Sequence, residues 1–324
     1  MRDRDSVDTA ETSILKGRQR LKKPPRPQKQ SSVDKRSSLD KRASADKRPG
    51  IDKPLGHPVH RAAFGVVITS IGRFLDIRDR VFGWVDSGYF EHETGERATR
   101  HAIASGASRL DAVFVEPAGG KAHTAVLLCH GIGETVKQWY GVQQLLAVNG
   151  VASLVFDYSG YGKSRGRAHW NQFERDAMAA FAALEHLAQG LPLSVVGFSL
   201  GSGVAVATIN QLCAGRESGA LRLVLCEAFT SFRGAAKAAW FPKPLTKLVP
   251  PIWHAQEPLA SCGVPVLIVH GEKDTLFPVR MAHDLAGFCA AKAHVVLVPD
   301  TAHNQPFRKP HLDYWGPVID WVSR

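Results

Sequence analysis

The sequence predicts an α/β fold with a doubly wound, mostly parallel sheet, a short Pro-rich cap segment and a disordered basic N-terminal tail. Three observations carry this prediction. From residue 124 onward, short apolar runs alternate with longer segments of helical periodicity. Glycines such as Gly150 and Gly190 stand where the helical segments stop. The chemically distinctive residues follow the apolar runs, at the carboxyl ends where open α/β sheets place their sites.

The first 56 residues are predicted to form a disordered tail. They carry +8 of the net charge of +11 of the 324-residue chain, and they have almost no aromatic or large apolar side chains. Such a composition cannot offset the conformational entropy of folding. A six-residue pattern recurs there as SVDKRS, SLDKRA and SADKRP. Because the basic charge belongs to the tail and not to the folded body, we predict no specific nucleic-acid partner.

Residues 57–84 turn apolar and have helical spacing, with Phe64, Val67, Ile68 and Ile71 on one side. We interpret this stretch as an amphipathic arm or helix that packs on the domain that follows. A helix lying on a membrane surface is the less favoured alternative. The folded domain is predicted to span residues 85–324.

Within that domain the elements are expected in a regular order. Residues 84–116 predict two or three short strands. Buried strands are expected at 124–129, 152–156, 193–198, 222–226, 264–269 and 294–298. Helices are expected at 134–149, 171–188, after the strand that ends at 198, near 278–289 and at about 311–322. Residues 229–262, with five prolines, interrupt this alternation and are predicted to form a cap or lid segment over a pocket.

A sharp turn follows the strand that ends at residue 198. Its sequence is Gly197-Phe198-Ser199-Leu200-Gly201, and a helix of small residues comes after it. The pattern Gly-x-Ser-x-Gly between a strand and a helix is typical of a nucleophile elbow, which exposes the serine hydroxyl at the edge of a sheet. Glycine is needed at 197 and 201 because neighbouring segments of the backbone are expected to pass too close there for a side chain.

A serine hydroxyl becomes a nucleophile when an imidazole accepts its proton, and a carboxylate holds that imidazole. Asp274 and His303 follow the expected strands at 264–269 and 294–298, in the chain order serine, acid, histidine that this turn requires. Asp300 is too near His303 in sequence to orient it, and Glu272 comes two residues early. We therefore predict Ser199, Asp274 and His303 as catalytic residues, and His270 as a packed or bracing residue.

Two backbone N–H groups are expected to bind the oxyanion. One belongs to Leu200, directly after the serine. The other lies in the loop His130-Gly131-Ile132-Gly133-Glu134, where we choose Ile132 and interpret His130 as a buried brace. A third loop contains Gly-Lys-Ser, but Asp157 stands where a phosphate loop needs glycine, so we interpret it as a turn with Tyr161 as a tentative pocket wall.

The segments HGIGE, DYSGYGKS, GFSLG, HGEKD and TAH, in this order and spacing, resemble the α/β-hydrolase superfamily. They look like its serine-hydrolase branch of esterases, acylglycerol lipase-like and serine aminopeptidase-like enzymes. The resemblance covers roughly residues 111–324. It implies an acyl-enzyme on Ser199, a small-molecule acyl substrate, and no metal or organic cofactor. The cap is smaller than a full cap domain, which suggests a shallow pocket.

The leading hypothesis is a serine hydrolase of carboxylic esters or thioesters. Trp240, Phe241 and Trp253 are tentative pocket residues, or else the small core of the cap. An aminopeptidase or amidase is the alternative, with Glu134 or Glu227 holding a substrate amine. A binding pseudoenzyme of the same fold is a third interpretation.

The sequence contains five cysteines, and their spacing matches no metal-binding or disulfide motif. Cys129 and Cys226 lie in apolar strand-like runs, so we expect buried, reduced thiols. With no apolar segment of a secretory signal and no apolar run near ~20 residues, the expected location is cytoplasmic.

Overall fold

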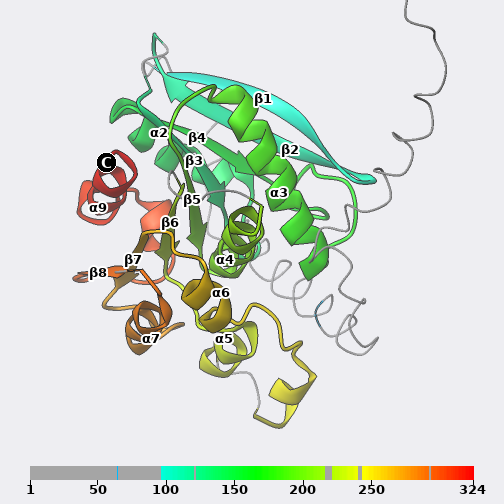
Figure 1. The fold of residues 1–324 in the computed structure, drawn as a ribbon, viewed down its shortest axis with the longest axis vertical. Helices are drawn as coiled ribbons and strands as arrows, with labels where there is room; N and C mark the ends of the chain where they lie inside the picture. The colour runs from blue at the N-terminus through cyan, green and yellow to red at the C-terminus, as the bar shows by residue number, and fades with distance from the viewer. Residues whose placement is uncertain (1–63, 65–95, 120–121, 216–220, 240–242, 292) are drawn as a thin grey trace, which may run out of the picture. The chain divides into compact units, whose positions relative to one another are not determined.

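The core of the protein, seen in a computed structural model, is an eight-stranded sheet in the order β1-β2-β4-β3-β5-β6-β7-β8 (Figure 1). The structure describes residues 64, 96–119, 122–215, 221–239, 243–291 and 293–324. The predictions for the tail at 1–56 lie outside the described residues, as do those for the arm at 57–84 apart from Phe64.

The first two strands form one long hairpin at an edge of the sheet. β1 (Glu96–Ser105) and β2 (Ser108–Pro117) pair antiparallel along their full length, and β2 pairs antiparallel with β4. The structure has two strands here, a number that the prediction of two or three short strands included, but each is ten residues long and not short. Side chains such as Leu110 and Phe114 face the core on every second residue, which favours one uninterrupted pairing.

The other strands run parallel, which confirms the predicted doubly wound, mostly parallel sheet. They are β3 (Thr124–Cys129), β4 (Val151–Phe156), β5 (Leu193–Phe198), β6 (Leu221–Cys226), β7 (Val266–Gly271) and β8 (Ala293–Val298). β3, β4 and β7 are buried at every residue. Strands covered on both faces need no alternation of apolar and polar side chains, which explains their continuous apolar runs.

Helices cover both faces of this sheet (Figure 1). On one face α3 (Trp170–Leu187), α4 (Leu200–Cys213) and α7 (Arg280–Phe288) contribute to the larger apolar cluster. On the other, α2 (Tyr140–Val148), α8 (Gln305–Arg308) and α9 (Leu312–Val322) pack in a second cluster. The helix predicted at 134–149 is shorter than expected. It begins as a 3-10 turn, η1 (Val136–Trp139), where the side chain of Gln138 accepts from the N–H of Thr135 and the carboxylate of Asp157 accepts from the N–H of Val136.

Between β6 and β7 the chain forms α5 (Phe232–Ala238), the 3-10 segment η3 (Lys243–Leu248) and α6 (Gln256–Ser261). The side chain of Arg233 donates to the carbonyl of Val249, which ties α5 to the chain after η3. Trp253 donates its indole N–H to Glu174 Oε1 on α3 at 3.0 Å. These bonds hold the segment to the main domain, and its role as a cap stays a prediction.

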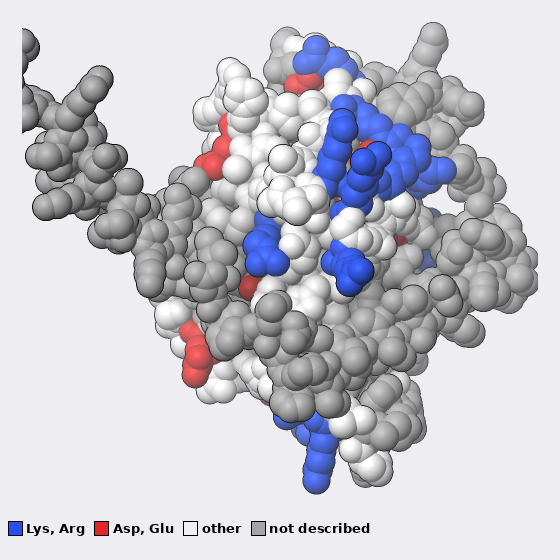
Figure 2. Space-filling model, turned by 90° about the vertical axis from the view of Figure 1, so that its right-hand side faces the viewer, with Lys and Arg blue, Asp and Glu red and all other residues white. Residues whose placement is uncertain are grey.

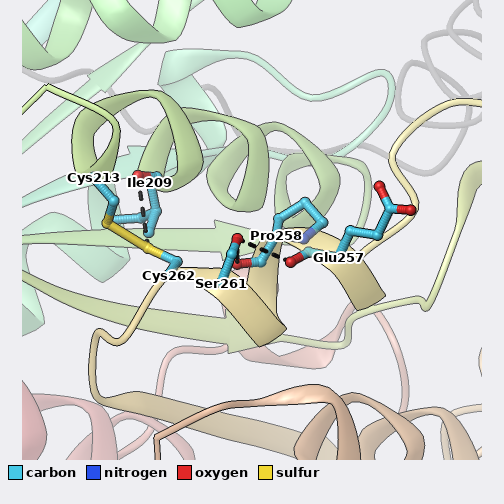
Figure 3. The surroundings of a disulfide bond; sticks show 6 residues. All are labelled: Ile209, Cys213, Glu257, Pro258, Ser261 and Cys262. Atoms are coloured by element: carbon cyan, nitrogen blue, oxygen red, sulfur yellow. Dashed lines mark hydrogen bonds between the residues drawn. A yellow bond between two sulfur atoms is a disulfide. The ribbon is translucent and has the colours of Figure 1, made fainter.

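The cysteines differ from the expectation in one respect. Cys129 and Cys226 are free and buried, as predicted, but Cys213 and Cys262 form a disulfide (Figure 3). It joins the end of α4 to the end of α6, with the two Cα atoms 6.1 Å apart. Disulfides are typical of oxidising compartments, so cysteine usage no longer supports the cytoplasmic prediction, which remains untested. None of the helices in the described part of the chain has the length and apolar character needed to cross a membrane.

Candidate active site

Ser199 lies in the turn between β5 and α4, with φ 51° and ψ −118°. Positive φ is strained for a residue with a side chain and requires close support from its surroundings. The backbone N–H of Ser199 donates to the carbonyl of Cys226 on the neighbouring strand, at 3.0 Å. A Cβ atom at Gly197 would lie 2.5 Å from the carbonyl of Gly201, and one at Gly201 would overlap the carbonyl of Cys129. The two glycines are therefore required because three segments of the backbone approach closely here.

The structure brings the three predicted catalytic residues together in one chain of hydrogen bonds. Ser199 Oγ lies 2.9 Å from His303 Nε2, and His303 Nδ1 lies 2.7 Å from Asp274 Oδ2. Asp274 follows β7 and His303 follows β8, so both side chains reach the edge of the sheet where the turn presents Ser199. The arrangement places a proton acceptor beside the serine and a carboxylate behind the acceptor.

The surroundings of Asp274 keep its carboxyl group ionised. Its Oδ1 accepts the backbone N–H groups of Leu276 and Phe277, at 2.7 and 2.9 Å. Burial, the largest single effect, acts to raise the pKa of Asp274, but the interactions with His303 and the hydrogen bonds of Glu227 and Phe277 together outweigh it and lower the pKa to about 2. An ionised carboxylate only accepts, so Nδ1 of His303 carries the proton and Nε2 is free to accept from Ser199.

Two phenylalanines fix the imidazole of His303 from its sides. The Phe277 ring meets it edge-on, with centroids 5.1 Å apart, and the Phe198 ring lies 5.6 Å away. Sequence reasoning did not assign either residue. Phe277 lies in the loop after β7, where no periodic pattern points to a packing partner.

The loop after β3 is held by Glu134, whose side chain turns back into it. Glu134 Oε2 accepts from the backbone N–H of Gly131 and from the indole N–H of Trp139, both at 2.8 Å. Neither the N–H of Ile132 nor that of Leu200 donates a hydrogen bond to another described residue. His130 is buried and pairs Nδ1 with the carbonyl of Gly131 at 2.8 Å, which fits its predicted role as a brace.

The loop after β4 forms a structural turn around Asp157. One carboxylate oxygen accepts from the N–H of Val136 at 2.8 Å, and the other from the N–H of Lys163 at 3.1 Å. A Cβ at Gly162 would overlap this carboxylate, which accounts for the glycine in the Gly-Lys-Ser sequence. Tyr161 lies inside an aromatic cluster with Phe173 and is only 8% exposed. Its predicted place in a pocket wall is not tested.

The two glutamates considered as holders of a substrate amine form hydrogen bonds within the protein, and a role in holding an amine stays a prediction. Glu134 braces the loop after β3 as described. Glu227 is fully buried, and its Oε1 accepts the backbone N–H of Gly271 at 2.8 Å.

Of the three aromatic residues of segment 229–262 predicted for the pocket, the structure describes only Trp253. Trp240 and Phe241 lie outside the described residues. Trp253 packs its ring against Phe232, with centroids 5.4 Å apart, and against Phe64, at 6.1 Å. Phe64 is fully buried among aromatic rings, including Trp170 and Phe173 of α3. The arm residue therefore contacts both the main domain and the segment between β6 and β7.

Glu227, Asp274 and His303 each offer one ligand atom within 4.8 Å of the others. In the described part of the chain they form the one group close enough to suggest a metal site. However, Asp274 Oδ2 and His303 Nδ1 are bonded directly to each other, and Nδ1 carries a proton. The residues fit a hydrogen-bonded chain better than a set of metal ligands.

Basic side chains gather on one face of the molecule. Figure 2 shows Lys and Arg outnumbering Asp and Glu among the described residues there. The loop after β4 runs along β2, since the N–H of Arg165 donates to the carbonyl of Arg109 at 2.9 Å. Around this contact between the loop after β4 and β2, four exposed cations have no acidic partner among the described residues: Arg109, Lys163, Arg165 and Arg167.

Comparison with known proteins places this chain in a family. Residues 124–243 match the family described as alpha/beta hydrolase fold. An uncharacterized protein of Mycobacterium tuberculosis is 32% identical over 202 residues, which are 61% of this chain and 69% of that protein. The chain therefore belongs to the alpha/beta hydrolase family, a family of hydrolases.

Other relatives are lipases. Lysophosphatidylserine lipase ABHD12 of Macaca fascicularis is 28% identical over 196 residues, or 56% of this chain and 49% of the lipase. The Danio rerio lipase of the same name is 26% identical and is covered to 63%. The chain thus spans about half to two thirds of the length of these lipases.

Solved structures agree on the fold. An esterase of Pyrococcus furiosus superposes with a TM-score of 0.59 at 17% identity, over 74% of this chain and 97% of the esterase. An esterase of Exiguobacterium antarcticum gives a TM-score of 0.53 at 16% identity, over 70% of this chain and the whole of that esterase.

Proposed function

We propose that the protein is a serine hydrolase that cleaves a carboxylic ester or thioester through an acyl-enzyme on Ser199. One observation carries the proposal, the hydrogen-bonded chain from Ser199 through His303 to Asp274. The positive φ of Ser199 adds support, because backbone strain of this kind persists only where the surrounding structure holds it in place, and it is concentrated at active sites. Membership of the alpha/beta hydrolase family agrees with this chemistry.

In this mechanism Ser199 Oγ attacks the carbonyl carbon while His303 Nε2 takes the hydroxyl proton. The oxyanion of the tetrahedral intermediate accepts the N–H groups of Ile132 and Leu200. His303 then gives its proton to the leaving alcohol or thiol, and the acyl group stays on Ser199. A water molecule then attacks the carbonyl carbon of the acyl-enzyme while His303 Nε2 takes its proton. The bond to Ser199 Oγ breaks, the carboxylic acid leaves, and His303 returns the proton to Ser199. Asp274 stabilises the charged imidazole in both halves.

The direct test combines fluorophosphonate labelling with a panel of p-nitrophenyl esters and aminoacyl amides. The wild type should be labelled and should cleave the esters, and Ser199→Ala should do neither. Ser261→Ala, which removes an exposed hydroxyl on α6, is the matched control and should behave as the wild type. No labelling of the wild type would refute the hydrolase. Turnover of aminoacyl amides without ester turnover would establish an aminopeptidase instead.

A lysophospholipid is the second candidate within this class of substrates. The specific observation in its favour is the group of exposed cations at residues 109, 163, 165 and 167, which suits a substrate with an anionic head group. The lipase activity that names the ABHD12 relatives agrees with this choice.

The head-group preference is tested by comparing lysophosphatidylserine with lysophosphatidylcholine at low and high salt. An anionic substrate steered by these cations should lose several-fold in kcat/KM as salt rises, because surface charges are screened. The double variant Arg165→Gln/Arg167→Gln should show the same loss at low salt. Equal salt dependence for the two lipids would refute the preference while leaving ester hydrolysis intact.

A further inference from the structure

Glu227 is a buried carboxyl group that the mechanism above does not use. It follows β6 directly, is fully buried and has φ 46°, a backbone conformation that side chains disfavour. Its N–H donates to the carbonyl of Val269 on β7, at 3.1 Å. The residue is thus fixed between two strands, at the sheet edge where Ser199 and Asp274 lie.

The two oxygens of Glu227 meet different surroundings. Oε1 accepts the N–H of Gly271 at 2.8 Å, whereas Oε2 is buried without a hydrogen-bond partner. The side-chain nitrogen His270 Nε2 lies 3.7 Å from Oε2. That nitrogen lies 3.0 Å from the carbonyl of Phe277, and since a carbonyl only accepts, its proton points there.

The Glu227 carboxyl group also meets the hydroxyl of Tyr314, which can donate to it, and the carboxylate of Asp274, which can only accept. Ligand atoms of Glu227, Asp274 and His303 all lie within 4.8 Å of one another. Asp274 is ionised and only accepts, so an ionised Glu227 would place two buried negative charges together. A proton on Oε2 removes that repulsion and supplies the donor that the geometry lacks.

The other titratable groups around Glu227 come from every element packed against it. They are Cys226 on β6, His270 and Asp274 at the end of β7, His303 after β8 and Tyr314 on α9. Burial, followed by the hydrogen bond and charge of Asp274, raises the pKa of Glu227 to about 9, against smaller opposite effects of Gly271 and Tyr314. The direction agrees with the geometry.

We propose that Glu227 is a positioning residue of this site, a neutral acid whose Oε2–H donates to the Asp274 carboxylate and holds it for His303. The proposal rests on the proposed function, since it assigns a partner to the acid of that mechanism. Asp274 then receives donors from Leu276, Phe277, His303 and Glu227. The cluster keeps a single negative charge, which matches the single positive charge that forms on His303 during turnover.

Glutamine reproduces this role without a titrating proton. Its carbonyl accepts from Gly271 and its amide N–H donates to Asp274, so Glu227→Gln should keep ester kcat/KM within ~3-fold at neutral pH. Glu227→Ala leaves Asp274 without this donor and should lose at least ~10-fold in kcat with little change in KM. Wild-type activity should fall above about pH 9, where Glu227 ionises, and the Gln variant should not show this fall.

Tyr314→Phe is the matched control, because it removes the other buried hydroxyl near Glu227. It should keep the alkaline fall, displaced if at all to higher pH, since the Tyr314 hydrogen bond lowers the pKa of Glu227. An alkaline fall in Glu227→Gln equal to that of the wild type would overturn the proposal. So would a loss in Glu227→Gln as large as in Asp274→Asn, because Glu227 would then act as an ionised acid.

A second measurement does not depend on turnover. Infrared difference spectra of Ser199→Ala carrying ¹³C-carboxyl glutamate should lose one protonated C=O stretch between neutral pH and about pH 10. The isotope shift assigns the band to glutamate, and Glu227→Gln should lack it. Absence of this band overturns the proposal about Glu227. If the band is present and the wild type cleaves no ester, the proposed function has failed while Glu227 is still the neutral acid inferred here.

Discussion

Asp274 and Asp300 show how far chain position identifies the acid of the site. Both follow strands at the same edge of the sheet, yet Asp274 bonds His303 at 2.7 Å while Asp300 pairs with Lys273 at the surface, 2.6 Å away. Sequence order was enough to prefer Asp274. The contribution of Glu227 could not be predicted, because its contact with Asp274 depends on how β6 and β7 pack.

Asp274→Asn should lower kcat by roughly 10⁴-fold, because a neutral amide neither stabilises the charged imidazole nor selects its tautomer. Asp300→Asn is the matched control, with the same chemical change three residues before His303. It should leave kcat within ~2-fold, as its side chain is 81% exposed. Steady-state ester kinetics on the two variants decide the assignment, and equal losses would contradict it.

The buried Glu227 also predicts how stability depends on pH. Its pKa is raised on folding, so the folded protein retains a proton that the unfolded chain loses. The stabilisation present below the unfolded pKa of about 4.3 is therefore lost progressively as pH rises toward about 9. Over this window the free energy of unfolding should fall by up to about 1.4 kcal/mol per pH unit for this group.

Glu227→Gln carries no such proton, so its stability relative to the wild type should increase as pH rises. Urea unfolding at several pH values between about 5 and 9 measures the difference. A constant difference across that range would show that Glu227 is already ionised in the folded protein.

At the scale of elements, the turn at Ser199 depends on how closely α4 approaches the loop after β3. A Cβ at Gly201 would lie 1.9 Å from the carbonyl oxygen of Cys129 and 2.7 Å from that of His130. The clash is with backbone, which cannot move without displacing the loop that contains Ile132.

Gly201→Ala should therefore destabilise the protein by about 3 kcal/mol and reduce ester turnover by more than ~10-fold. Gly287→Ala on α7 is the control, since a Cβ there meets nothing within 4 Å. It should be neutral or slightly stabilising, as alanine favours helices. Thermal unfolding and ester kinetics measure both effects, and a Gly201→Ala protein with wild-type activity would refute the close approach.

Regular elements of the sheet were predictable because buried parallel strands and amphipathic helices have distinct periods. The strands β1 and β2 were predicted too short, since antiparallel pairing partners are not encoded in the local pattern. The 3-10 turn η1 was missed for a similar reason. Its start depends on Asp157, which comes from a different loop and accepts from Val136.

At the scale of the whole molecule, the disulfide between Cys213 and Cys262 joins residues 49 apart in sequence. The enclosed chain contains β6, α5, η3 and α6. The sequence did not reveal this pair, because the two cysteines meet only when α6 packs beside α4. A cross-link of this span restricts the unfolded chain and should contribute about 2–4 kcal/mol to stability.

Reductant should accordingly lower the free energy of unfolding of the wild type by that amount. The double variant Cys213→Ser/Cys262→Ser should already be less stable, and reductant should not change it further. Urea unfolding with and without reductant provides the comparison. Wild-type unfolding that is indifferent to reductant would show that the bond does not form.

In the proposed mechanism Ser199 forms a covalent acyl-enzyme. Acid quenching during turnover of a p-nitrophenyl ester, followed by intact-protein and peptide mass spectrometry, tests it directly. The expected result is one acyl group per chain, on the peptide that contains Ser199, with none on Ser199→Ala. An acyl group on a different residue, or ester turnover that persists in Ser199→Ala, would contradict the mechanism.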